Sequence, residues 1–171
     1  MLKSHAKLLS LLEVAGEIKT RKKIQKIIYL LKQKKAPFTE DFTLHHYGPY
    51  SSELQIELDQ LEDSELIQPT SSLDAEVYKF NLSEEAKKLL ENNRTAVNKL
   101  QVNNFNTLIK ELNKFEPSLL ESMATIVYFE KSYGIDKEKL KKAVLNIKPH
   151  LKNIFDNAWS ELDRLELHIN L

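Results

Sequence analysis

The sequence predicts a mainly α-helical protein with a minor β component, and three observations support this. Glycine and proline are rare, with three and five among 171 residues, so long segments are free of helix breakers. Hydrophobic residues make up 42% of the chain, enough for a buried core, and this excludes global disorder. Apolar residues recur at helical spacing along most of the chain, whereas short strand-like stretches occur only between residues 42 and 82.

Two helices are expected to open the chain. Residues 3–15 carry leucines at helical spacing, and Thr20 is a suitable N-cap for a second helix, "RKKIQKIIYLLKQ". The apolar positions of the second helix form a single stripe: Ile24, Ile27, Ile28 and Leu31. Lys22, Lys26 and Tyr29 are therefore expected on the opposite, exposed side of this helix.

A strand, a turn and a third helix follow. "FTLHHY" is rich in aromatic and β-branched residues, which favours a strand. Gly48 and Pro49 are expected to form a structural turn, and the third helix then begins near Tyr50 or Ser51. The buried stripe of this helix is expected to consist of Leu54, Leu58 and Leu61.

A β-hairpin and a fourth helix complete the N-terminal part. "LIQP" is interpreted as a strand, "TSSLDA" as a polar loop and "VYKFNL" as a half-buried strand. Ser83 is the expected N-cap of the next helix, with Glu84 and Glu85 in its first turn. Three helices, a hairpin and a helix form the order of a winged helix-turn-helix-like domain, which we predict over residues 1–90 with the hairpin as its wing.

Residues 91–171 are predicted to form an all-helical C-terminal region. Pro117 opens its most apolar segment, "PSLLESMATIVYFEKSYG", and Asp136 is the expected N-cap of "KEKLKKAVLNIK". Pro149 starts the last segment. Because "SMATIVYF" is too apolar to face water, we expect this region to pack against the N-terminal domain.

The residue inventory disfavours catalysis and metal binding. The chain has no cysteine, which excludes disulfides and thiol chemistry, and it has no glycine-rich phosphate loop or G-x-S-x-G motif. His45 and His46 are adjacent on an expected strand, so their side chains point to opposite faces and cannot both bind one metal. We predict no catalytic residue, no metal site, no cofactor and no enzymatic activity.

The N-terminus does not resemble a secretory signal. "MLKSHAKLLSLLEVAGE" carries charges throughout, and no apolar run approaches the roughly 18 residues that a membrane span requires. We therefore expect a cytoplasmic bacterial protein that does not contact membranes.

Charge is segregated along the chain although the net charge is zero. Residues 1–35 contain ten Lys/Arg and two Glu, whereas residues 36–76 contain ten Asp/Glu and no Lys or Arg. Two interpretations remain open: a charged partner, or two blocks that face each other within the fold. The third helix would be the DNA-reading helix of a winged helix, yet it is acidic and would repel phosphates.

Two surfaces are candidates for binding. The basic second helix offers possible nucleic-acid contacts at Lys19, Arg21, Lys22, Lys23, Lys26 and Tyr29. The turn and the acidic outer face of the third helix offer possible protein contacts at Tyr47, Tyr50, Glu53, Ile56, Asp59 and Asp63. The tyrosines could equally have the structural role of joining the strand to the helix. A homodimer could form through the C-terminal helices, at Trp159 and the terminal "LELHINL".

Several motifs carry a resemblance to known families. Through "HAKLL", "RKKIQKIIY", "HHYGPYSSEL", "SLLESMATIVYFEKSYG" and "NIKPH", the chain resembles an uncharacterised bacterial family labelled YwgA-like, which implies a fold but no activity. A looser similarity exists to the Panacea or SocA-like antitoxin domain, which places an "LQKLLYF"-like helix before a "YGP" turn. The corresponding positions here are Gln25, Lys26, Ile28, Tyr29, Tyr47, Gly48 and Pro49.

The antitoxin resemblance implies a module that binds and restrains a protein partner, although the acidic third helix and the long helical C-terminus depart from that domain. The resulting expectation is a non-enzymatic regulatory or adaptor module that acts by protein–protein interaction, with antitoxin-like restraint as one form that the resemblance implies. The alternative is a DNA-binding transcriptional regulator that uses the basic second helix.

Overall fold

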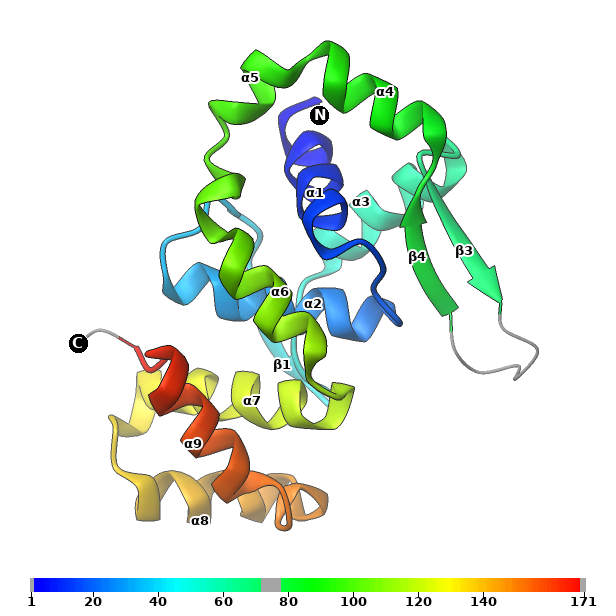
Figure 1. Cartoon of the computed structure of the whole chain (residues 1–171). Helices are drawn as coiled ribbons and strands as arrows, with labels where there is room; N and C mark the ends of the chain where they lie inside the picture. The colour runs from blue at the N-terminus through cyan, green and yellow to red at the C-terminus, as the bar shows by residue number, and fades with distance from the viewer. Residues whose placement is uncertain (1, 72–77, 170–171) are drawn as a thin grey trace.

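The computed structural model describes residues 2–71 and 78–169, and most of these are helical (Figure 1). The N-terminal part contains α1 (Leu2–Ala15), α2 (Arg21–Gln33), β1 (Thr43–His45), β2 (Gly48–Tyr50), α3 (Ser52–Asp63), β3 (Ile67–Ser71), β4 (Tyr78–Leu82) and α4 (Glu84–Asn92). The remainder contains α5 (Arg94–Asn98), the 3₁₀ helix η1 (Val102–Phe105), α6 (Asn106–Lys114), α7 (Pro117–Tyr133), α8 (Lys137–Ile147), the 3₁₀ helix η2 (Pro149–Leu151) and α9 (Phe155–Leu165). The mainly α-helical fold class is thus confirmed.

Side-chain caps define where four of the helices begin. The side chains of Thr20, Ser51, Ser83 and Asp136 each accept a hydrogen bond from the backbone N–H three residues later, at the starts of α2, α3, α4 and α8. A helix N-terminus leaves backbone N–H groups without partners inside the helix, and these oxygens satisfy one of them. The helix starts predicted from the caps Thr20, Ser83 and Asp136 are confirmed.

The β1–β2 hairpin differs from the predicted strand and turn. Thr43 pairs with Tyr50 and His45 with Gly48, so the turn consists of His46 and Tyr47. The prediction that Gly48 and Pro49 form the turn is therefore wrong, since both lie in β2. The physical reason is that Gly48 has φ +87°, a conformation that glycine often adopts directly after the turn of a hairpin.

The second hairpin, β3–β4, lies where the sequence predicts it, with Ile67 paired to Leu82. The loop expected at "TSSLDA" lies largely outside the described residues, as does Val77. The connection between α1 and α2 adds a bridge that the sequence does not predict. Ile18 and Phe80 exchange backbone hydrogen bonds with N···O distances of 2.8 and 3.2 Å, which ties this connection to the edge of β4.

Helix α2 lies in the interior of the fold, with α6 and α7 packed against it and α7 also in contact with β2, α8 and α9. Every residue of α2 from Lys23 to Leu31 is buried. The expectation that Lys26 and Tyr29 share an exposed face is therefore wrong. The apolar stripe of α2 does face the core, but α7 and β2 cover the opposite side of the helix as well.

A continuous hydrophobic core runs through the chain, from Leu8 in α1 to Leu167 after α9. The predicted domain boundary after residue 90 falls inside α4. In Figure 1, α4 and α5 lie at one end of the molecule and α8 at the other, with α2 and α6 between them. Among the described residues, no helix combines the length and apolarity needed to cross a membrane.

Candidate functional site

A pocket of about 350 Å³ lies between α2 and the β1–β2 hairpin. It is lined by Arg21, Lys22, Gln25, Lys26, His45, His46, Tyr47, Gly48, Tyr50 and Gln55. None of these lining residues is acidic. The pocket thus brings together three of the predicted contacts of the basic helix, Arg21, Lys22 and Lys26, and the tyrosines of the hairpin, which the sequence assigned to separate surfaces.

Gln25 joins α2 to the start of α3. Its amide is buried and makes two hydrogen bonds of 2.9 Å with one residue: Oε1 accepts from the Ser51 N–H, and Nε2 donates to the Ser51 carbonyl. Ser51 is also the N-cap of α3. The position of α3 relative to α2 is therefore held by a reciprocal pair of buried hydrogen bonds, which are costly to leave unmade.

Lys26 joins α2 to β2. The residue is 3% exposed, and its Nζ donates a hydrogen bond of 2.5 Å to the Pro49 carbonyl. Burial lowers the pKa of Lys26 to about 8, because a desolvated ammonium group is disfavoured. The charge of Glu121 opposes this shift, whereas the neighbouring ammonium groups of Lys148 and Lys22 add to it.

Residues from the C-terminal half complete the polar network beneath the hairpin. The Lys148 ammonium lies 3.2 Å from the Glu121 carboxylate and donates to the His46 carbonyl. His150 Nε2 lies 3.1 Å from the same Glu121 oxygen. Glu121 and Lys148 are both buried, so a single carboxylate of α7 contacts both the lysine that holds the turn at His46 and the neighbouring His150.

The hairpin backbone packs closely on the helices at Gly48. A Cβ atom at this position would lie 3.0 Å from Thr125 Oγ1 and 3.3 Å from Lys26 Cε. Only glycine leaves room for this approach. The floor of the pocket therefore consists of backbone held directly against α2 and α7.

Charge pairing between α2 and α3 bears on the two interpretations of the charge blocks. Arg21 lies 2.5 Å from Asp59 and 2.6 Å from Glu62, so the blocks face each other at this point. Such partly exposed pairs contribute only up to about 1 kcal/mol each. The Arg21 guanidinium is nevertheless already paired with two carboxylates of α3.

The remaining predicted nucleic-acid contacts divide into buried and exposed residues. Lys23 is buried and donates to the Asn113 carbonyl at 2.5 Å, and Tyr29 is buried between aromatic rings. Lys19 and Lys22 are exposed. The Lys22 ammonium lies 3.3 Å from the centre of the Tyr47 ring, a cation–π contact at the rim of the pocket.

The predicted protein-contact residues lie partly at the pocket and partly beside it. Tyr47 is 48% exposed at the tip of the hairpin, and Tyr50 is half-buried with its ring 4.8 Å from that of His45. On α3, Glu53, Ile56 and Asp63 are exposed but do not line the pocket. The exposed surface therefore continues from the pocket onto the outer face of α3.

Sequence reasoning missed Glu121, Lys148 and His150, because they lie far from the hairpin along the chain, after residue 120, whereas the hairpin ends at Tyr50. A weak signal was present in α2, where Gln25 and Lys26 interrupt an otherwise apolar run. Polar residues inside such a run indicate buried hydrogen bonds. Over the described ranges, no three His, Asp or Glu side chains gather where they could hold a metal ion.

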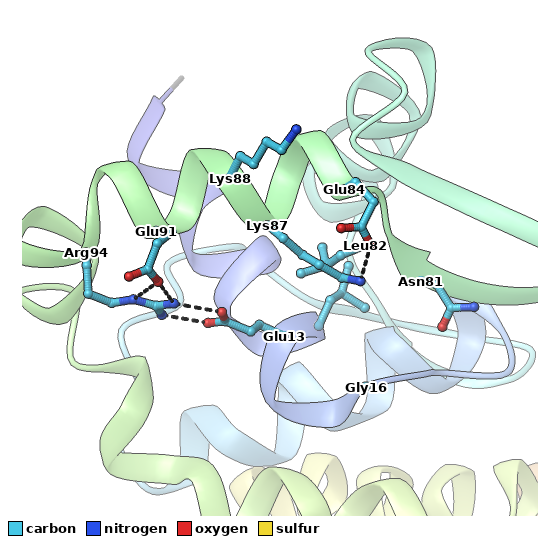
Figure 2. A pocket seen from close by; sticks show the side chains of 10 residues that line it. Glu13, Gly16, Asn81, Leu82, Glu84, Lys87, Lys88, Glu91 and Arg94 are labelled. Carbon is cyan, nitrogen blue, oxygen red and sulfur yellow. Dashed lines mark hydrogen bonds and ion pairs between the residues drawn. The ribbon is translucent and has the colours of Figure 1, made fainter.

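A larger pocket, of about 680 Å³, lies between α1, β4 and α4 (Figure 2). Five of its six charged groups bind one another: Arg94 contacts Glu13 at 2.9 Å and Glu91 at 2.7 Å, and Lys87 contacts Glu84 at 2.6 Å. These pairs leave little charge for a ligand. The pocket at the hairpin, whose lining contains basic residues and no acidic one, is the better candidate site.

Comparison with known proteins gives one informative relative. No family model matches the chain. The chain is 31% identical to the uncharacterised protein YwgA of Bacillus subtilis strain 168, over 97% of its own length and 98% of the relative. The similarity therefore extends over the helices, both hairpins and the residues that line the pocket.

Proposed function

Since the chain belongs to the family of the uncharacterised Bacillus subtilis protein YwgA, we propose a function from its own surface: a non-enzymatic regulatory or adaptor module that binds a protein partner through the β1–β2 hairpin and the adjoining face of α3. The observation that carries this proposal is the exposure of Tyr47 on a hairpin that is held by buried hydrogen bonds. Exposed aromatic residues on a rigid support are typical anchors of protein interfaces.

The hairpin is preorganised for binding. Lys26 holds the Pro49 carbonyl, Lys148 holds the His46 carbonyl, and Gln25 holds Ser51 directly after β2. Each contact comes from a buried side chain, so little backbone freedom would be lost when a partner binds. Preorganisation of this kind raises affinity because it lowers the entropic cost of association.

The surface beside the hairpin supports the same proposal. Ile56 is 55% exposed on the outer face of α3, between the acidic side chains of Glu53 and Asp63 along the helix. An apolar residue with charged neighbours suits an interface whose charges select the partner. The proposed interface thus comprises Tyr47 and Tyr50 of the hairpin and Ile56 of α3, with the carboxylates at its edge.

We also propose that α1 to α3 and the β3–β4 hairpin form a winged helix-turn-helix-like domain. The order of the elements supports this, as does the Ile18–Phe80 bridge that ties the α1–α2 connection to the hairpin. DNA binding through α2 is the less supported alternative. Arg21 is paired with carboxylates and Lys23 and Lys26 are buried, which leaves Lys19 and Lys22 for phosphate contacts along this helix.

The looser resemblance to antitoxin domains is consistent with partner binding. Gln25, Lys26, Gly48 and Pro49 are among the positions that carry this resemblance, and they are the residues that fasten the hairpin to α2. A hairpin held in this way could bind and restrain a partner protein. Antitoxin-like restraint is therefore one form that the proposed function could take.

Photo-crosslinking in the native host tests the proposal. A benzophenone amino acid is introduced at Tyr47, at Ile56 and, as a control, at Leu89, which is 43% exposed on α4. We expect the same protein to be captured from Tyr47 and Ile56 but not from Leu89, and to be identified by mass spectrometry. With the purified partner, Tyr47→Ala should weaken binding about tenfold, as is typical for an aromatic anchor.

Two outcomes would overturn the proposal. One is equal capture at all three positions, which would indicate random collision. The other is a purified captured protein whose affinity does not change with Tyr47→Ala.

A further inference from the structure

We infer that the pocket between α2 and the β1–β2 hairpin binds a carboxylate side chain of an acidic peptide segment in the partner protein. This inference rests on the proposed function and specifies the chemistry that the partner presents at this surface. Three features of the pocket carry it: the charge of its lining, the balance of buried charge beneath it, and its surroundings.

The lining is cationic. Lys22 and Lys26 contribute ammonium groups and His45 and His46 contribute imidazoles, and no lining residue is acidic. Arg21 also lines the pocket, but its guanidinium is paired with carboxylates of α3. The ammonium groups available to a ligand are therefore those of Lys22, which also contacts the Tyr47 ring, and Lys26, which also donates to the Pro49 carbonyl.

The buried charges beneath the pocket are unequal. Lys26 and Lys148 are each 3% exposed, and the electrostatic environment of Lys26 contains one carboxylate, Glu121, against the two ammonium groups of Lys148 and Lys22. Glu121 is also contacted by His150. A buried cation is costly unless an anion accompanies it. A ligand carboxylate in the pocket would add a second negative charge to that of Glu121.

The lowered pKa of Lys26 is consistent with this arrangement. Burial is its main cause, and the two neighbouring lysines contribute. A bound carboxylate would favour the ammonium form and raise the pKa of Lys26. This gives a measurable sign of binding that a purely structural role of Lys26 would not produce.

The negative charges of α3 beside the pocket favour a peptide ligand over a nucleic acid. The exposed carboxylates of α3, Glu53, Asp59 and Asp63, lie on the helix that contributes Gln55 to the pocket. They would repel the extended polyanion of a duplex. A short acidic peptide brings far fewer negative charges near α3 than a duplex does, and the rings of Tyr47 and Tyr50 provide apolar contact for the residues beside the bound carboxylate.

A titration followed by NMR tests the inference on the full-length protein. The probes are acetylated, amidated triglutamate, the matching triglutamine, and a short duplex DNA. We expect triglutamate to shift the backbone amides of Gln25, Lys26 and residues 46–48 and to raise the pKa of the Lys26 ammonium, and triglutamine to do neither. Shifts of equal size with triglutamine, shifts confined to other lysines, or tighter binding of the duplex at these amides would overturn the inference.

Variants localise the binding. Lys26→Met keeps the aliphatic stem and removes the charge, and it should weaken triglutamate binding about tenfold, as expected for a lost hydrogen bond to a charged group. Because Lys26 is buried, Lys22→Gln provides a second test at an exposed position, with an expected loss of about threefold. Lys142→Gln, an exposed lysine of α8, is the matched control and should leave affinity unchanged.

Equal effects of Lys22→Gln and Lys142→Gln on triglutamate affinity would refute the pocket as the binding site.

Failure of the carboxylate inference can be distinguished from failure of the proposed function. If Tyr47 crosslinks a partner but triglutamate does not bind, the carboxylate inference alone is wrong. If triglutamate binds but no partner is captured, the proposed interface is wrong.

Discussion

Gly48 lies at the closest approach between the β1–β2 hairpin and the helices that support it. The sequence indicated that this glycine matters for the chain direction, because "YGPY" is typical of a turn. It did not indicate that the residue lies in β2, against Thr125 and Lys26. At the residue scale, the sequence can predict that a glycine is needed for the backbone conformation. It cannot predict the contact that also requires glycine, because that contact comes from another part of the chain.

We predict that Gly48→Ala destabilises the protein by about 2–4 kcal/mol, since strain at φ +87° adds to the cost of overpacking against Thr125. The free energy of unfolding in urea measures this loss. Gly16→Ala is the matched control, because Gly16 has φ +76° but no atom within 4 Å of an added Cβ. In Gly16→Ala, the free energy of unfolding should fall only by the cost of the positive φ angle, about 1–2 kcal/mol. Equal losses in the two variants would show that the contact at Gly48 is unimportant.

At the scale of elements, the helix starts were predictable and the covered faces were not. Capping side chains act on N–H groups within three residues, so Thr20, Ser51 and Ser83 locate helix starts from local sequence alone. The exposure of α2 depends on α6 and α7, which follow much later in the chain. The apolar stripe of α2 correctly indicated one buried face, but periodicity cannot show that polar residues on the other face are buried too.

The link between α2 and α3 gives a prediction at this scale. Gln25→Leu should destabilise the protein by about 2–4 kcal/mol, because the buried N–H and carbonyl of Ser51 both lose their partner. Urea unfolding measures the loss, and faster amide exchange at Ser51 would locate it. Gln33→Leu is the control, since Gln33 donates to the Tyr29 carbonyl within the same helix and should cost about 1 kcal/mol or less. Similar costs for the two variants would argue against Gln25 as the link between the helices.

At the scale of the whole molecule, the C-terminal segment is attached to α7 by a charged contact. Glu130 is fully buried in α7 and accepts hydrogen bonds from the His168 ring and, at 2.9 Å, from the Ile169 N–H. Asp163 lies 3.1 Å from the other ring nitrogen of His168. Burial alone lowers the pKa of His168, but Glu130 and Asp163 outweigh it, so the pKa of His168 lies above its ordinary value of 6.5.

This contact predicts a pH dependence of stability. Because the pKa of His168 is higher in the folded state than in the unfolded state, its stabilising contribution is complete below pH 6.5 and is lost as the pH rises through the folded-state pKa. The melting temperature of the wild type should therefore exceed that of His168→Gln most at acidic pH, with the difference shrinking toward alkaline pH. A difference between wild type and His168→Gln that grows with pH would contradict the assignment.

By itself, the sequence determined the helical fold class, the starts of α2, α4 and α8 and the β3–β4 hairpin, because caps and strand alternation act over a few residues. The placement of the candidate site was decided only by the tertiary structure. Lys26 belongs to an amphipathic pattern that predicts exposure, yet it is buried beside Glu121 and beneath the hairpin. Burial depends on what packs against a surface, and α7 reaches α2 across the intervening residues 34–116, a separation over which local pattern carries no information.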